Sequence, residues 1–155
     1  MLEETVGKLL MEKQLTIACA ESCTGGLLTS CLTDVEGSSA YVMGSVVSYT
    51  NEVKESLVGV KHETLVTHGA VSEATVREMA EGIRHVIGTA LGVGITGIAG
   101  PGGGTETKPV GLVYIAVAGD KGTTVKKNIF HGSRMENKRS SVEKALEMLH
   151  AYLYQ

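Results

Sequence analysis

Residues 72–104, SEATVREMAEGIRHVIGTALGVGITGIAGPGGG, decide the fold class, because they place a helix, a strand and a glycine-rich loop in direct succession. The apolar residues between Val76 and Ile87 recur at the spacing of one helix face, which predicts an amphipathic helix beginning at Ser72. Residues 90–96 are a short, mainly apolar run of strand length, and it leads straight into the glycine-rich loop. This succession favours an α/β protein.

The rest of the chain continues the alternation of helices and strands. Ahead of the quoted stretch, we predict in order a helix over residues 1–14, a strand over 15–20, a helix from Leu27 to a break at Gly37, a strand over 43–50, and a short helix capped by Asn51. After it, we predict strands over 110–118 and 123–130, a hairpin link at 119–122, and a helix over 135–153.

The order of these elements predicts a three-layer α/β/α fold. Its sheet should be mixed, parallel in the early strands and antiparallel in the late ones. The strand over residues 110–118 is apolar on both faces, so we expect it to lie in the middle of the sheet. With one core expected at this chain length, residues 1–155 should form a single domain.

Two glycine-containing loops, residues 22–26 and 96–104, follow predicted strands. Ligands of open α/β sheets bind beyond the carboxyl ends of the strands, so we expect the active site where these two loops meet. Glycine allows a ligand to approach the backbone closely. The second loop lacks the Gly-Lys-Ser/Thr ending of a Walker motif, and it is not a Rossmann fingerprint either.

Composition argues against several classes of protein. With 14 basic and 17 acidic residues, the chain lacks the positive charge that nucleic-acid binding requires. No apolar run is long enough to cross a bilayer, and the acidic start contains no export signal, so we expect a cytoplasmic protein without a membrane partner. The cysteines and histidines have no metal-ligand spacing, and we therefore predict reduced thiols, no metal and no cofactor.

Three side chains near the first loop are candidates for chemistry. Ser22 follows a strand and precedes a helix, so its hydroxyl is either a nucleophile or a helix cap, and Thr24 can also serve as that cap. Cys23 is either a stronger nucleophile or a packed thiol. Lys54 would be the third residue of a helix capped by Asn51, where the helix dipole lowers the pKa of a lysine. With a lowered pKa, Lys54 would be a usable base. The alternative is that Lys54 is a solvated lysine on the surface of a short helix.

Positive charge gathers at the start of the last helix, where Arg134 is followed by Lys138 and Arg139. Together with helix amides, a guanidinium makes an anion site that suits a phosphate. The alternative is a solvated basic end, with these residues paired to Glu136 or Glu143.

Five ordered motifs cover nearly the whole chain: Ala20-Glu21-Ser22-Cys23-Thr24-Gly25-Gly26, Ser48-Tyr49-Thr50-Asn51-Glu52-Val53-Lys54, His68-Gly69-Ala70-Val71-Ser72-Glu73, Thr96-Gly97-Ile98-Ala99-Gly100-Pro101 and Lys108-Pro109-Val110-Gly111. Together they strongly resemble the CinA C-terminal domain family, which includes the nicotinamide mononucleotide amidohydrolases called PncC. The resemblance implies a standalone form of this domain. The activity it implies is hydrolysis of the carboxamide of nicotinamide mononucleotide to nicotinate mononucleotide and ammonia, without a metal.

The resemblance also implies roles for single residues. Ser22 would be the nucleophile and Lys54 its general base, while backbone amides after Ser22 or in the loop from Thr96 would hold the oxyanion. On this basis we assign catalytic roles to Ser22, Lys54 and Tyr49, and substrate contacts to Thr24, Gly25, Gly26, Asn51, Thr96, Gly97, Gly100 and Arg134. The expected partner is a phosphorylated pyridine nucleotide, and we expect a homo-oligomer, with a dimer favoured.

Two positions depart from the family pattern. Ser133 stands where the family has an aspartate that would orient Arg134, and Asn137 stands where an aliphatic residue is usual. Two other functions remain open at this point. One is a non-catalytic, nucleotide-binding regulatory module with the same pocket, and the other is an amidohydrolase that uses Cys23.

Overall fold

The computed structural model describes all of residues 1–155 and contains a five-stranded sheet in the order β2-β1-β3-β4-β5. In chain order, the strands are β1 (Ile17–Glu21), β2 (Val42–Val47), β3 (Leu91–Gly97), β4 (Leu112–Gly119) and β5 (Gly122–Ile129). β1 pairs in parallel with β2 and β3, whereas β4 pairs antiparallel with β3 and β5. The predicted mixed sheet is therefore confirmed, as are the hairpin between β4 and β5 and the interior place of β4.

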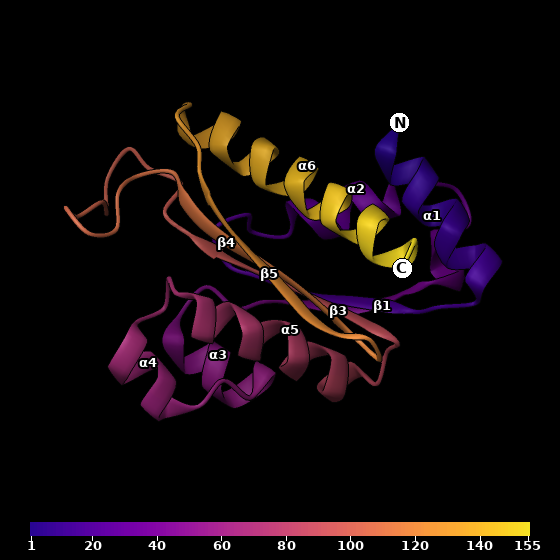
Figure 1. Cartoon of the computed structure of the whole chain (residues 1–155), viewed down its shortest axis with the longest axis horizontal. Coiled ribbons are helices and arrows are strands. Elements are labelled where there is room, and N and C mark those ends of the chain that lie inside the picture. Colours follow the sequence, from indigo (N-terminus) through magenta and orange to yellow (C-terminus); the bar gives the residue numbers. More distant parts are fainter.

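Helices cover both faces of this sheet (Figure 1). One face carries α1 (Leu2–Lys13), α2 (Leu27–Thr33) and α6 (Arg134–Leu153), and the other carries α3 (Asn51–Val58), α4 (His62–His68) and α5 (Glu73–Ile87). The largest group of buried apolar side chains lies between the sheet and the first set of helices, and two smaller groups lie on the α5 side. The predicted three layers are confirmed.

Glycines in β3 let α5 lie very close to the sheet. A Cβ atom on Gly92 would lie 2.2 Å from the carbonyl oxygen of Ala80, and one on Gly94 would lie 2.7 Å from the carbonyl oxygen of Val76. Such distances are far below van der Waals contact, so no other residue fits at these positions without moving the helix. Ser72 begins α5 as predicted, because its hydroxyl accepts a hydrogen bond from the amide of Thr75 at 3.1 Å.

Two sequence-based expectations are wrong. The helix cap of α3 is Thr50, whose hydroxyl accepts a hydrogen bond from Val53 N at 3.3 Å, while Asn51 is the first helical residue and is exposed. The short helix α4 was not predicted at all. It has only one buried residue, Leu65, so its sequence carries almost no apolar periodicity.

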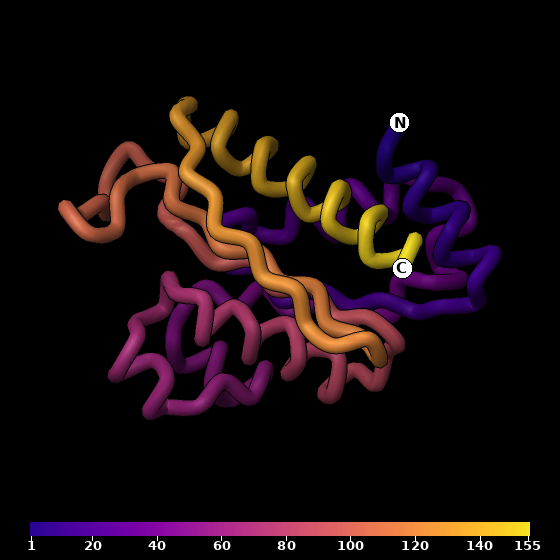
Figure 2. Tube along the Cα trace, viewed as in Figure 1, coloured from indigo at the N-terminus to yellow at the C-terminus, as the bar shows by residue number.

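The loop after β3 and the start of α6 lie at the same end of the molecule, opposite the end where the chain terminates (Figure 2). This is also the end to which the carboxyl ends of the parallel strands β1 and β3 point. None of the helices combines the length and the apolar character that crossing a membrane requires.

Candidate active site

Ser22 stands directly after β1, at the carboxyl edge of the sheet. Its amide donates to the carbonyl oxygen of Ile95 in β3 at 3.0 Å, which ties the first loop to the strand that leads into the second. The turn then needs two left-handed residues, and Gly25 and Gly26 supply them with φ angles of +62° and +101°. The predicted meeting of the two loops is confirmed at this point.

Glu21 holds the turn in place from inside the protein. Its fully buried carboxylate accepts hydrogen bonds from the hydroxyl of Thr24 at 2.7 Å, the amide of Leu28 at 2.9 Å, and both the amide and the hydroxyl of Thr29 at 2.9 and 2.6 Å. These bonds satisfy free amides at the start of α2. Our sequence analysis missed this role, although an acidic residue at the end of a buried strand was a usable signal.

Lys54 reaches the nucleophile candidate from α3. Its Nζ lies 3.2 Å from Ser22 Oγ, 2.8 Å from the carbonyl oxygen of Ser48 and 3.4 Å from that of Tyr49. The lysine is 1% exposed, and none of the four ion pairs in the chain includes it. It is therefore a buried amine surrounded by neutral oxygens, and not the solvated surface lysine of the alternative reading.

Burial lowers the pKa of Lys54 below its ordinary value, and proximity to Cys23 opposes this shift in part. The cause differs from the one expected from sequence. Because Thr50 is the cap, Lys54 is the fourth residue of α3 and not the third. Removal from water, and not the helix dipole, is thus the main reason why its amine gives up a proton more easily.

Cys23 lies beside Ser22 but is a poor nucleophile. The residue is buried, and burial raises the pKa of its thiol to about 12. At neutral pH the sulfur therefore keeps its proton, and a thiol without its thiolate form is weakly reactive. The packed-thiol reading is favoured over a cysteine-dependent mechanism.

A cavity of about 270 Å³ opens over this pair. It gathers predicted site residues from four separate segments of the chain: Ser22, Tyr49, Lys54, Thr96, Gly97, Gly100 and Arg134. Its wall also includes Cys23, the alternative nucleophile, and residues that our assignment of the site did not name, namely Ala70, Val71, Ile98, Ala99, Gly102 and Gly103. Four residues predicted to contact substrate, Thr24, Gly25, Gly26 and Asn51, do not line it.

Thr96 shapes one wall of the cavity. Its hydroxyl donates to the carbonyl oxygen of Ala70 at 2.8 Å and so holds the connection between α4 and α5 against β3. Ala70 and Val71 come from the third of the five motifs, which shows why that motif belongs to the site.

Residues 1–153 match the CinA C-terminal domain. The chain belongs to this family. It is 48% identical over 152 residues to a protein of Acetivibrio thermocellus, and 54% identical over 133 residues to one of Clostridioides difficile, both provisionally named competence-damage inducible protein. These alignments cover 98% and 86% of this chain but only 37% and 32% of the two relatives. The chain thus spans about a third of the length of the curated relatives it matches.

Solved structures of CinA proteins have the same fold. The competence/damage inducible protein CihA of Agrobacterium tumefaciens is 40% identical to this chain with a TM-score of 0.93, and the alignment covers 100% of this chain and 97% of the other. The competence damage-inducible protein A of Klebsiella pneumoniae is 34% identical with a TM-score of 0.96, covering 99% and 96%. Their names state no reaction.

In this CinA domain, Arg134 extends across the cavity from the first turn of α6. Its guanidinium donates to the carbonyl oxygen of Gly100 at 2.7 Å and to the hydroxyl of Tyr49 at 3.2 Å. It forms no ion pair with Glu136 or Glu143. The remaining N–H groups of Arg134 are free to bind an anion.

The two departures from the CinA pattern have separate structural roles. Ser133 caps α6: its hydroxyl accepts a hydrogen bond from the amide of Glu136, and the Glu136 carboxylate accepts one from the amide of Ser133. Asn137 is buried and connects α6 to the loop after β3. Arg134 is oriented by the two oxygens to which it donates, those of Gly100 and Tyr49.

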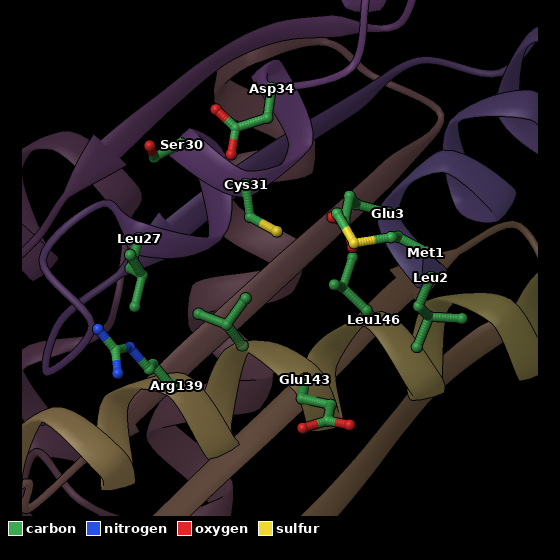
Figure 3. Close-up of a pocket in the computed structure, with 11 residues that line it drawn as sticks. Met1, Leu2, Glu3, Leu27, Ser30, Cys31, Asp34, Arg139, Glu143 and Leu146 are labelled. Carbon is green, nitrogen blue, oxygen red and sulfur yellow. The ribbon is translucent and has the colours of Figure 1, made fainter.

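The CinA domain has a larger cavity, of about 440 Å³, but it contains none of the predicted site residues. This cavity lies between α1, α2 and α6, with Leu27, Cys31 and Leu146 facing it (Figure 3). Burial and the nearby carboxylates of Glu3 and Asp34 all raise the pKa of the Cys31 thiol, which makes it a poor nucleophile. No group of three or more His, Cys, Asp or Glu side chains is arranged to hold a metal ion anywhere in the chain.

Proposed function

We propose that this chain is an amidohydrolase that converts the carboxamide of nicotinamide mononucleotide to nicotinate mononucleotide and ammonia, with Ser22 as nucleophile and Lys54 as base. One observation carries the proposal: the buried Lys54 Nζ lies 3.2 Å from Ser22 Oγ, beside a cavity that no carboxylate lines. A nucleophile within hydrogen-bond reach of a base with a lowered pKa is the arrangement that acyl transfer needs. Since the pair supplies both groups, the proposed reaction requires no metal.

The surroundings of Lys54 favour proton transfer from Ser22. The carbonyl oxygens of Ser48 and Tyr49 can only accept hydrogen bonds, so they bind two N–H groups of Lys54. When the amine is neutral it has only two N–H groups, and its lone pair is then left for the third neighbour, the hydroxyl of Ser22. The hydroxyl donates to this lone pair, which is the direction in which its proton must move.

The reaction proceeds by two acyl transfers. Ser22 Oγ bonds to the carboxamide carbon while its proton passes to Lys54, and a tetrahedral intermediate with a negatively charged oxygen forms. As the carbon–nitrogen bond breaks, Lys54 returns the proton to the leaving nitrogen and ammonia departs. Water then attacks the acyl-enzyme with Lys54 again as the base, which releases the carboxylic acid and restores Ser22.

The other predicted residues fit the binding of a nucleotide. Arg134 would anchor the phosphate with the N–H groups that neither Gly100 nor Tyr49 uses, and this contact would place the amide against Ser22. Tyr49 links the two ends of the site, because its carbonyl oxygen accepts from Lys54 and its hydroxyl accepts from Arg134. We assign it this connecting role.

Ammonia release with nicotinamide mononucleotide, nicotinamide and glutamine tests the proposal. We expect release from the nucleotide, and we expect Ser22→Ala and Lys54→Met each to lower it by roughly 10³-fold or more. The exposed Ser30→Ala and Lys61→Met are matched controls that should keep full activity. Full activity in either site variant would rule out the Ser/Lys pair.

The same cavity also suits a regulatory module that binds a nucleotide but catalyses no reaction. Arg134 and the free amides of the cavity wall support binding whether or not Ser22 reacts. Thermal stabilisation by nicotinamide mononucleotide with no ammonia produced would favour this second function.

A further inference from the structure

The loop that follows β3 uses its carbonyl oxygens and leaves its amides free. Ala99 O accepts a hydrogen bond from Asn137 Nδ2 at 2.9 Å, and Gly100 O accepts one from Arg134 at 2.7 Å. The N–H groups of Ala99 and Gly100 donate to no acceptor in the chain, although both residues are buried and line the cavity beside Ser22. Buried amides without a partner are costly, so these two point to an oxygen atom supplied by a ligand.

The carbonyl contacts determine where these amides point. In a trans peptide the C=O and the N–H lie on opposite sides, and the Ala99–Gly100 peptide is trans. Because Asn137 holds Ala99 O on the α6 side, the Gly100 N–H points away from α6. Similarly, Ile98 O accepts a hydrogen bond from Gly111 N at 2.7 Å, which turns the Ala99 N–H away from Gly111. Since Ala99 and Gly100 both line the cavity, their free amides are available to it.

We propose that the N–H groups of Ala99 and Gly100 hold the carbonyl oxygen of the scissile amide as negative charge develops on it, and that Asn137 is the positioning residue that aims them. This inference rests on the amide hydrolysis proposed above. Donors that stabilise an oxyanion act through being held in place before the reaction. Asn137 is suited to keep these donors in place, because it is itself held firmly. It is 1% exposed, it does not line the cavity, and its Oδ1 accepts a hydrogen bond from the amide of Gly132 at 2.9 Å.

Asn137 donates a hydrogen bond to Ala99 O, and an apolar residue at this position has no group that could do so. A leucine of similar size would fill the space but would leave Ala99 O without a donor, so the Ala99–Gly100 peptide would lose its fixed orientation.

The first test compares Asn137→Leu with Ser141→Ala. The control removes a neighbouring buried hydrogen bond on the same helix, from Ser141 Oγ to Asn137 O at 2.7 Å, and leaves the loop contact intact. We expect kcat for ammonia release to fall about 10²-fold in Asn137→Leu with KM little changed, because the donors act on the transition state. The control should keep its kcat. An unchanged kcat in Asn137→Leu, or a rise in KM that matches the loss in kcat, would overturn the proposal.

A second variant covers the case in which Asn137→Leu fails to fold. Asn137→Asp keeps the acceptor for Gly132, but its carboxyl can donate to Ala99 O only while protonated. Because Lys54 must still lose its proton for the reaction, loss of the carboxyl proton opposes this gain as pH rises, and the kcat of Asn137→Asp should lack the rise with pH that the wild type shows. A residue with a merely structural role would leave that rise in place. An Asn137→Asp profile parallel to that of the wild type contradicts the inference.

A third measurement separates this inference from the proposed function. A small fluorophosphonate phosphonylates an active serine: the Ser22 oxygen–phosphorus bond forms, fluoride leaves, and Lys54 takes the hydroxyl proton. Its phosphoryl oxygen needs the same donors as an oxyanion, so labelling of Ser22, followed by intact mass, should slow about 10²-fold in Asn137→Leu relative to wild type and Ser141→Ala. If the wild type releases no ammonia from nicotinamide mononucleotide, the proposed substrate is wrong, yet slowed labelling still supports the donors. Equal labelling rates refute them.

Discussion

Replacing Glu21 with glutamine should destabilise the protein strongly. The Glu21 carboxylate accepts four hydrogen bonds, two of them from the amide and the hydroxyl of Thr29. In Glu21→Gln, an NH2 group would face Thr29, so these two bonds are lost and a buried amide meets another donor. Hydrogen bonds to charged groups contribute about 1.5–3 kcal/mol each, so the expected loss for two bonds is about 3–6 kcal/mol. Domains of this kind have only about 5–15 kcal/mol in total.

Urea and thermal denaturation of Glu21→Gln measure this loss directly. For a chain of this length, the expected decrease in Tm is roughly 6–24 °C. Glu36→Gln is the matched control, because Glu36 is exposed and its free energy of unfolding should change by less than about 0.5 kcal/mol. A Glu21→Gln protein within about 1 kcal/mol of the wild type would refute the reasoning, since the Ser22 turn would then not depend on the carboxylate.

Four other predictions follow from buried groups. Folding lowers the pKa of Lys54, so the unfolded state binds more protons than the folded state at pH values between the lowered pKa and 10.5. In that pH range, the free energy of unfolding of the wild type relative to Lys54→Met should therefore rise with pH. A difference in urea midpoints that stays constant with pH contradicts this. The Cys23 thiol, with a pKa of about 12, should resist iodoacetamide at neutral pH, and peptide mapping that finds rapid alkylation there would be inconsistent with its burial. Tyr41→Phe removes a buried hydroxyl that has no partner and should stabilise the protein by about 1 kcal/mol, whereas a lower urea midpoint would show a missed partner. Gly92→Ala places a Cβ 2.2 Å from Ala80 O and should cost about 1–3 kcal/mol, and an unchanged Tm would show that α5 can shift freely.

The sequence predicted the elements best where local pattern is strong. The apolar period from Val76 to Ile87 and the runs that became β1, β3 and β4 each depend on neighbours within a few residues, and these elements were found. The pattern was weak over α4, which buries only Leu65, and that helix was missed. Thr50 and Asn51 are both good cap residues, so composition could not choose between them.

The sequence by itself determined the alternation of helices and strands, the two glycine-containing loops at strand ends, and the motifs that brought Ser22 and Lys54 to notice. Only the tertiary structure decided what those residues can do. Ser22 and Lys54 are 32 positions apart, and Asn137 and Ala99 are 38 apart, so folding alone brings each pair together. The same packing removes water from Lys54, which lowers its pKa, and holds the peptide after Ala99 through the hydrogen bond from Asn137. Proton affinity and the direction of an amide depend on the surroundings in space, and residues distant along the chain supply most of those surroundings.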